Sequence, residues 1–106
     1  MPRYMFEAKL TDQGLKGVLQ EGAAKRLEVV SALFASLGGN LEIAYWAFGE
    51  ADFIAIAELP DNQAAIAGAT TVVAAGTASV KTTVLLDADE MDEARTRSLD
   101  YRPPQA

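Results

Sequence analysis

Polar and apolar residues alternate over two stretches of the chain, residues 4–10 and 79–86. Alternation with a period of two predicts a strand with one apolar face in each stretch. The opposite face carries Met5, Glu7 and Lys9 in the first strand and includes Lys81 in the last. Between them, residues 45–59 hold two apolar runs rich in aromatic and β-branched residues, separated by a turn at Gly49. This stretch predicts a β-hairpin around which the rest of the chain is arranged.

Apolar residues recur at helical spacing between and after these strands. The predicted helices cover residues 15–19, 23–37, 62–75 and 87–97. Thr11 or Asp12 can cap the first of them, and Asp87 has the capping-box spacing to Glu90 in the last. The third helix has Gln63 as its only large polar side chain, so little of its surface is suited to water.

The resulting order is strand, helix, strand, strand, helix, strand, with an extra helix at the end. The rule of right-handed crossovers, applied to this order, predicts an α+β fold: a ferredoxin-like βαββαβ sandwich whose long helices cover one sheet face. We expect residues 1–97 to form this single domain. Residues 98–106, which include Pro103 and Pro104, are expected to be a flexible tail or an arm that lies on a neighbouring subunit.

The amino-acid composition disfavours several classes of binding partner and of catalytic group for this chain. The 106 residues carry a net charge of −6, which disfavours binding to nucleic acid or to an anionic membrane surface. The chain has no cysteine and no histidine, so thiolate nucleophiles, sulfur ligands and the commonest general base are absent. We therefore expect no cofactor and no metal. The chain shows no signal peptide and no apolar stretch of about 18 residues, so a cytoplasmic location is expected.

The second face of the predicted sheet has no covering layer within the chain. It would expose Met5 and Leu85 together with either the pair Trp46 and Phe48 or the pair Tyr45 and Ala47. Soluble proteins rarely expose a large apolar patch, so we expect a homo-oligomer with a dimer as its smallest unit. The polar residues of this face are Glu7, Lys9 and Lys81. They either line a ligand chamber between subunits or pair with one another in the dimer.

Asp52 is the sharpest single candidate for chemistry. It stands at the start of a strand flanked by aromatic residues, where burial would raise the pKa of its carboxyl group and suit it to acid or base catalysis. The alternative is that Asp52 accepts hydrogen bonds from backbone amides at the hairpin turn. Tyr45 and Trp46 can line a chamber, or they can belong to the core.

Six motifs carry a resemblance to a known family. They are Tyr4-Met5-Phe6, Leu10-Thr11-Asp12-Gln13-Gly14, Leu37-Gly38-Gly39, Tyr45-Trp46-Ala47-Phe48-Gly49, Asp52-Phe53-Ile54-Ala55-Ile56 and Pro60-Asp61. Together they resemble the GYD-domain family over nearly the whole chain. Gly49 and Asp52 match its Gly, Tyr, Asp signature, whereas Ala51 stands where the family usually has tyrosine. The resemblance implies a dimeric α/β barrel, in which two ferredoxin-like sheets pair through their open faces.

Two functions are compatible with these observations. The first is a homo-oligomeric small-molecule-binding module, since the spacing of Gly49 and Asp52 and the fold also resemble the ligand-binding domains of leucine-responsive-type regulators. The alternative is a small cofactor-independent enzyme, similar to the monooxygenases and isomerases on related barrels. The absence of histidine favours binding. The expected ligand-binding residues are Tyr45, Trp46, Phe48, Asp52, Glu7, Lys9 and Lys81.

Overall fold

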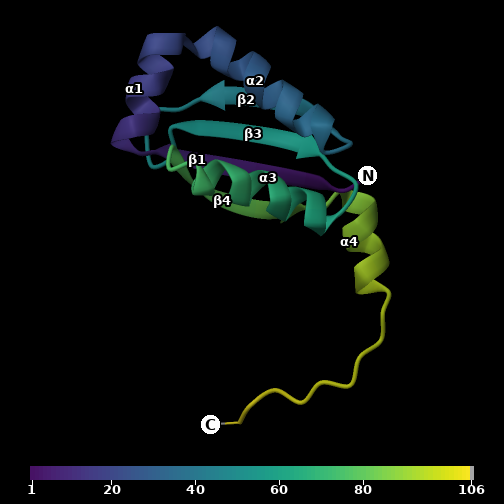
Figure 1. The fold of residues 1–106 in the computed structure, drawn as a ribbon. Helices are drawn as coiled ribbons and strands as arrows, with labels where there is room; N and C mark the ends of the chain where they lie inside the picture. The colour runs from purple at the N-terminus through teal and green to yellow at the C-terminus, as the bar shows by residue number, and fades with distance from the viewer. Residues whose placement is uncertain (106) are drawn as a thin grey trace.

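The computed structural model describes residues 1–105, which form one four-stranded sheet and four helices (Figure 1). In chain order the elements are β1 (Arg3–Leu10), α1 (Asp12–Glu21), α2 (Ala23–Ser36), β2 (Asn40–Trp46), β3 (Phe53–Glu58), α3 (Asn62–Ala74), β4 (Ala78–Leu85) and α4 (Ala88–Arg95). The predicted order of strands and helices is confirmed, with two helices, α1 and α2, in the first crossover.

The sheet has the strand order β2-β3-β1-β4, and every neighbouring pair is antiparallel. The two strands in the middle, β1 and β3, pair through Tyr4 with Ala57, Phe6 with Ala55, and Ala8 with Phe53. This α+β architecture with an open antiparallel sheet is compatible with the predicted ferredoxin-like sandwich.

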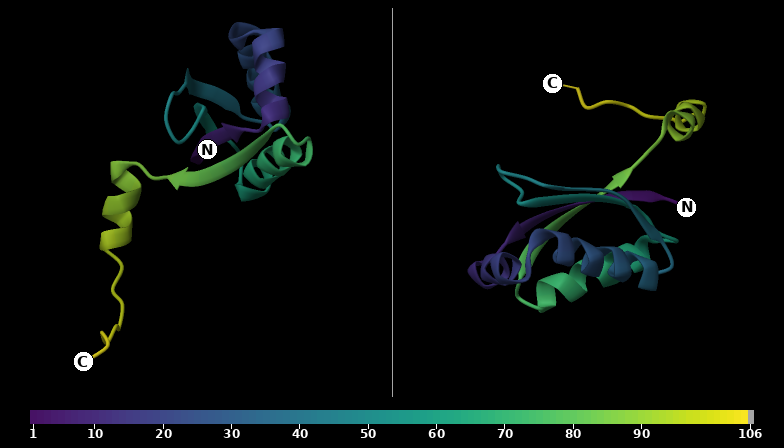
Figure 2. Two further views of the ribbon diagram at one scale, coloured as in Figure 1. Left: turned by 90° about the vertical axis from the view of Figure 1, so that its left-hand side faces the viewer. Right: turned by 90° about the horizontal axis from the view of Figure 1, so that it is seen from above.

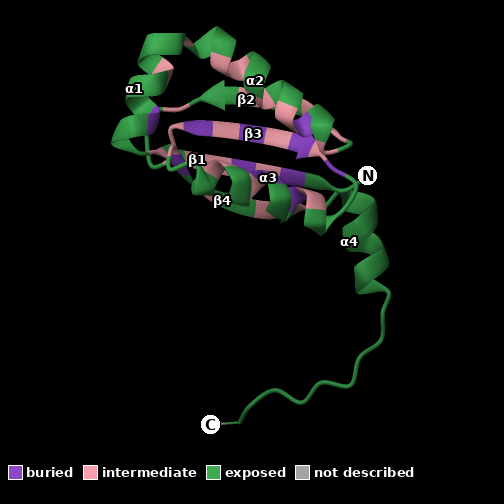
Figure 3. Cartoon of the chain, in the orientation of Figure 1, coloured by how far each residue is buried: buried purple, intermediate pink, exposed green. Residues whose placement is uncertain are grey.

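All three helices of the crossovers lie on one face of the sheet, as Figure 2 shows from above. The core lies between them and the two middle strands, which carry more of the buried residues in Figure 3 than the other elements do. Its aromatic residues are in contact: the ring centroids of Phe6 and Phe34 are 5.2 Å apart, and those of Tyr4 and Phe6 are 6.3 Å apart. The helix-facing side of β1 therefore follows the predicted alternation.

Side-chain caps begin three of the helices. Thr11 caps α1 by accepting a hydrogen bond from the Gly14 amide, and Asp61 caps α3 in the same way through Ala64. Asp87 and Glu90 form the predicted capping box of α4, in which each side chain accepts from the other's backbone amide. Of the two candidates for the first cap, the structure selects Thr11.

Gly14 brings α1 very close to the start of β4. A Cβ atom at position 14 would lie 1.9 Å from the Thr77 carbonyl oxygen, a distance that no side chain tolerates. The Thr11 amide donates to the same carbonyl at 3.0 Å, and the Thr11 hydroxyl donates to the Gly76 carbonyl at 2.7 Å. Glycine at position 14 is thus required for the contact between the helix and the strand.

The structure corrects the predicted hairpin. The strand that holds Tyr45 begins at Asn40, immediately after Gly38 and Gly39, and it ends at Trp46. Phe48 consequently lies in the connection 47–52 and not in a strand. A register shift between Leu41 and Ile43 interrupts the regular alternation of β2, which is why the aromatic run alone gave the wrong start.

The C-terminal segment leaves the body of the molecule. α4 ends at Arg95, two residues before the predicted end, and residues 96–105 form neither helix nor strand. Figures 1 and 2 show α4 and this tail extending away from the sheet. The radius of gyration is 17.0 Å, whereas a compact chain of this length would have about 13 Å. Leu99 and Tyr101 are exposed on the extended segment.

None of the helices formed by residues 1–105 combines the length and the apolar composition that crossing a bilayer requires.

Candidate functional site

The two faces of the sheet present two different candidate sites. One is the open face, on which the sequence places most of its candidate ligand-binding residues. The other is a cavity on the opposite face, enclosed by the sheet and the helices, which the sequence pattern did not predict.

Strand register arranges the open face into four parallel rows. The first three rows cross the whole sheet from β4 through β1 and β3 to β2, and the fourth joins β4 and β1 only. In order, the rows are Leu85, Arg3, Glu58 and Asn40; then Thr83, Met5, Ile56 and Ile43; then Lys81, Glu7, Ile54 and Tyr45; and finally Ser79 and Lys9. The second row is almost entirely apolar, and the rows on either side of it contain charged side chains.

Arg3, in the first row, is paired with two carboxylates. Its guanidinium donates to the Glu42 carboxylate at 2.8 Å and to the Glu58 carboxylate at 3.2 Å. The hydrogen bond to Glu42, followed by the negative charges of Glu42 and Glu58, raises the pKa of Arg3 above its usual value. These three residues are therefore already paired within one chain.

Asp52 accepts hydrogen bonds from the neighbouring strand. Its Oδ2 atom accepts from the Leu10 amide at 2.9 Å, and its Oδ1 atom accepts from the Lys9 ammonium group at 3.2 Å. The Leu10 amide, with a further contribution from Lys9, lowers the pKa of Asp52 although partial burial acts in the opposite direction. The hypothesis of a raised pKa is therefore wrong. The backbone-accepting role is correct, but the donor belongs to the end of β1 and not to the hairpin turn.

The two aromatic residues at the end of β2 point to opposite sides of the sheet. Tyr45 shares a row with Ile54 on the open face, and its side chain is 69% exposed. Trp46 pairs with Phe53 in the register, and the two rings are in contact on the helix side with centroids 4.9 Å apart. Of the two alternatives for the open face, the one with Tyr45 is correct for this strand. The placement of Trp46 there is wrong.

Phe48 is fully exposed in the connection between β2 and β3. Ala47, its neighbour, is held to the base of this connection because its amide donates to the Asp52 carbonyl at 2.8 Å. The Asp52 amide in turn donates to the Ala8 carbonyl at 2.8 Å. Asp52 thus links the connection to β1 through its backbone and its side chain.

Glu7, Lys81 and Tyr45 lie in one row of the open face, and Lys9 lies in the next. Glu7 stands directly opposite Lys81 in the register, yet the two form no ion pair within 4 Å in the described part of the chain. Five of the seven predicted ligand-binding residues therefore gather at one end of this face: Tyr45, Glu7, Lys9, Lys81 and Asp52.

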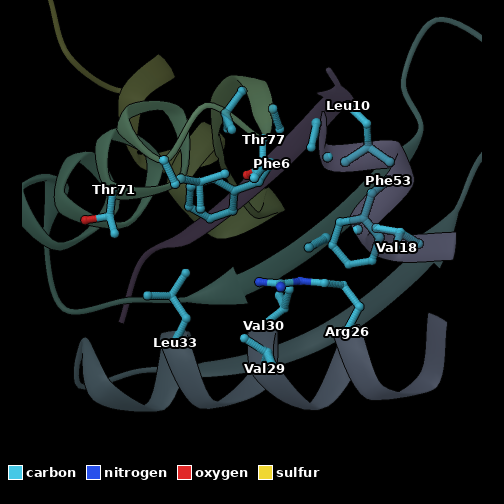
Figure 4. A pocket seen from close by; sticks show the side chains of 18 of the residues that line it. Phe6, Leu10, Val18, Arg26, Val29, Val30, Leu33, Phe53, Thr71 and Thr77 are labelled. Atoms are coloured by element: carbon cyan, nitrogen blue, oxygen red, sulfur yellow. The ribbon is translucent and has the colours of Figure 1, made fainter. Parts of the chain in front are cut away.

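The cavity on the helix side measures about 920 Å³, within the range typical of small-molecule sites. It exists because α2 packs over the edge strand β2 whereas α3 packs over the opposite edge strand β4. The space between these helices has the middle strands as its floor, including Phe6, Phe53 and Ala55. Figure 4 shows the side chains of Leu33 and Val30 from α2 facing those of Phe6 and Phe53.

Polar side chains enter the lining mainly from α1 and the beginning of α2. They are Gln13, Lys16, Gln20, Glu21 and Arg26. The Arg26 side chain extends along α2 into the cavity near the ring of Phe53 (Figure 4). Small residues, namely Gly68 and Ala69 of α3 and Ala75 at its C-cap, line the other side and leave the space open. The nearly uniform apolar sequence of this helix was the one signal that could have indicated a cavity.

Comparisons with known proteins gave one match. The family model described as GYD domain matches residues 4–94, which is most of the chain. No curated protein and no solved structure matched.

Proposed function

The chain belongs to the GYD-domain family, and we propose that it functions as a homo-oligomeric module that binds a small molecule between two open sheet faces. The single observation that carries this proposal is the uncovered apolar row of the sheet, Met5, Ile56 and Ile43. Met5 and Ile56 alternate with the buried, helix-facing residues of β1 and β3, so their side chains lie on the opposite face of the sheet. Figure 2 shows α1, α2 and α3 on one face of the sheet only.

The pattern of the open face suits a symmetric dimer. In a two-fold interface the same patch meets itself, so an apolar row can pack against its copy while charged rows meet across the axis. Ile43 is 46% exposed and Tyr45 is 69% exposed in the single chain, and burial of such side chains favours association. Arg3 of the first row is already paired with Glu58 of that row and with the nearby Glu42, so this end of the face can form a polar rim.

The row of Lys81, Glu7 and Tyr45 favours a ligand chamber between the two open faces over an interface without a ligand. Its ionisable groups make no ion pair within the described residues, whereas Lys9 is paired with Asp52. Burying unpaired charges costs free energy, so such groups need either partners or a ligand. A polar ligand that contacts Glu7 and Lys81 together, with the Tyr45 ring beside it, would satisfy them.

The oligomer is tested by light scattering coupled to size-exclusion chromatography. We expect a dimer or a higher oligomer at micromolar concentration. The variant Ile56→Lys should dissociate, because it places a charge in the centre of the apolar row without touching the core. Leu19→Lys, at a 76% exposed position of α1, is the matched control and should keep the parent mass. A parent protein that is monomeric at this concentration would contradict the proposal.

The chamber is tested by thermal shift with amino acids, small aromatic molecules and quinones. A ligand of the chamber should raise the melting temperature of the parent but not that of Lys81→Gln or Glu7→Gln, because binding to the native state alone stabilises it. Mass spectrometry of the recovered ligand then separates binding from catalysis. An unchanged ligand supports the binding module, and a converted one supports the enzymatic alternative.

A further inference from the structure

We propose that the cavity between the sheet and the helices is a second binding site, independent of the open face, that takes an elongated apolar molecule with one carboxylate. It lies on the opposite face of the sheet from Glu7, Lys81 and Tyr45. The chemistry of its lining divides into a long apolar part and a short charged part, and the ligand class follows from that division.

The apolar part runs from α2 across the sheet to α3. It is built from Val30 and Leu33 of α2, from Phe53 and Ala55 of the floor, and from Val72 of α3. This part has no charged side chain, because the charged members of the lining all come from α1 and the first turn of α2. An apolar chain gains free energy in proportion to the surface it buries there, whereas a polar ligand would lose its hydration without replacement.

The charged part centres on Arg26. Its guanidinium forms an ion pair with the Glu21 carboxylate, at an N–O distance of 3.6 Å that is longer than a hydrogen bond. No side-chain hydrogen bond among residues 1–105 uses the Arg26 guanidinium, so its N–H donors can still donate to a ligand. Lys16 adds a second positive charge to the same lining, so the two cations outnumber the one carboxylate.

A guanidinium that lines an apolar cavity and makes no side-chain hydrogen bond favours a carboxylate at the end of an apolar chain. A planar guanidinium can donate two parallel hydrogen bonds to one carboxylate, which an alcohol cannot accept in the same way. An ammonium head group would instead be repelled by Arg26 and Lys16. The expected order of affinity for chains of equal length is therefore acid, alcohol, amine.

Trp46 provides a built-in reporter for this site. It is the only tryptophan of the chain, it lines the cavity, and it contacts Phe53 of the cavity floor. Because it lies on the helix side, its fluorescence reports on the cavity and not on the pairing of open faces.

The test is a titration of the full-length protein with decanoate, 1-decanol and decylamine, followed by the fluorescence of Trp46. We expect saturable binding of decanoate, with 1-decanol weaker by about tenfold, the factor that a charge-assisted hydrogen bond provides. Arg26→Gln should remove this difference, whereas Arg97→Gln, an exposed arginine of the tail, should preserve it. Equal affinities of acid and alcohol in the parent would overturn the role of Arg26.

A second pair of variants tests the location. Ala69→Phe adds a ring to the lining and should abolish decanoate binding, whereas Ala67→Phe, at an exposed position of the same helix, should leave it unchanged. Circular dichroism and the melting temperature establish that each variant is folded. If folded Ala69→Phe binds like the parent, or if decanoate produces no saturable response at all, the proposal is wrong. The oligomer measured by light scattering bears only on the open face, so the two proposals fail separately.

Discussion

The side chain of Asp52 accepts a hydrogen bond from the amide of Leu10 at 2.9 Å, across 42 positions of the sequence. The connection between β2 and β3 is thereby attached to the end of β1, next to the turn that leads into α1. A carboxylate that is stabilised in its charged form by an amide and an ammonium group makes stability depend on pH.

Asp52→Ala should lower the free energy of unfolding at about pH 7. The difference between parent and variant should disappear in acid. The lowered pKa means that the folded state binds the proton less readily than the unfolded chain, whose aspartate pKa is about 3.9. The stabilisation is present above that value and is lost as pH falls through the lower pKa of the folded state. Melting temperatures of parent and variant should therefore converge as the pH falls below the aspartate pKa of the unfolded chain. Asp100→Ala, on the exposed tail, is the control; a difference that is constant with pH would contradict the role of the charge.

Two glycines of α1 should respond to alanine in opposite directions. Gly14→Ala should destabilise the protein by about 1–3 kcal/mol, because the new methyl group meets the Thr77 carbonyl. Gly17→Ala has open space around its Cβ atom and should stabilise the helix by about 0.5–1 kcal/mol. Urea unfolding measures both values. If Gly14→Ala proved neutral, the close approach of α1 to Thr77 would be wrong.

Tyr4→Phe should cost about 1 kcal/mol of unfolding free energy. The Tyr4 ring is 2% exposed, and its hydroxyl donates to the Asn62 Oδ1 atom at 2.6 Å, which ties β1 to the first residue of α3. The variant keeps the ring in the core and removes only this hydrogen bond. Tyr101→Phe, at a 75% exposed position, controls for the substitution and should have no measurable effect in urea unfolding.

Ala51→Tyr restores the ring that the family signature carries and should be tolerated. Ala51 is half-buried in the connection 47–52 and does not belong to the buried core, so a larger side chain there need not enter the core. We expect the unfolding free energy to change by less than about 0.5 kcal/mol. Ala57→Tyr, at a fully buried position, is the contrast and should lose at least about 1–3 kcal/mol. A comparable loss at position 51 would show that the site is already filled.

Regular alternation predicted the faces of β1 and β4 correctly. Because side chains alternate with a period of two, the face of one residue determines the face of every other residue in the strand. The same reasoning could not decide between Tyr45 and Trp46. Both residues are aromatic, so the strand would have an apolar face whether Tyr45 or Trp46 lay on the open side of the sheet. The shift between Leu41 and Ile43 also breaks the period before the strand reaches them.

The cavity and the hydrogen bond from Leu10 to Asp52 could not be predicted from the sequence for a different reason. Helical periodicity shows which side of α2 and α3 is apolar, but the distance between the two helices depends on which strands they cover. Likewise, the carboxylate of Asp52 meets the Leu10 amide only because β3 and β1 pair in one particular register. Both features arise from tertiary packing, which local patterns do not encode.

The first strand to be synthesised lies in the middle of the finished sheet. β1 pairs with β3 on one side and with β4 on the other, and β4 ends at Leu85. A nascent chain that has emerged only as far as α3 can complete the β1 pairing with β3, but it still has one bare edge along Arg3–Leu10. Unpaired strand edges are the usual starting points of aggregation. During synthesis, the second edge of β1 therefore stays unpaired until β4 has been made, that is, while the chain from Asn62 to Leu85 is translated.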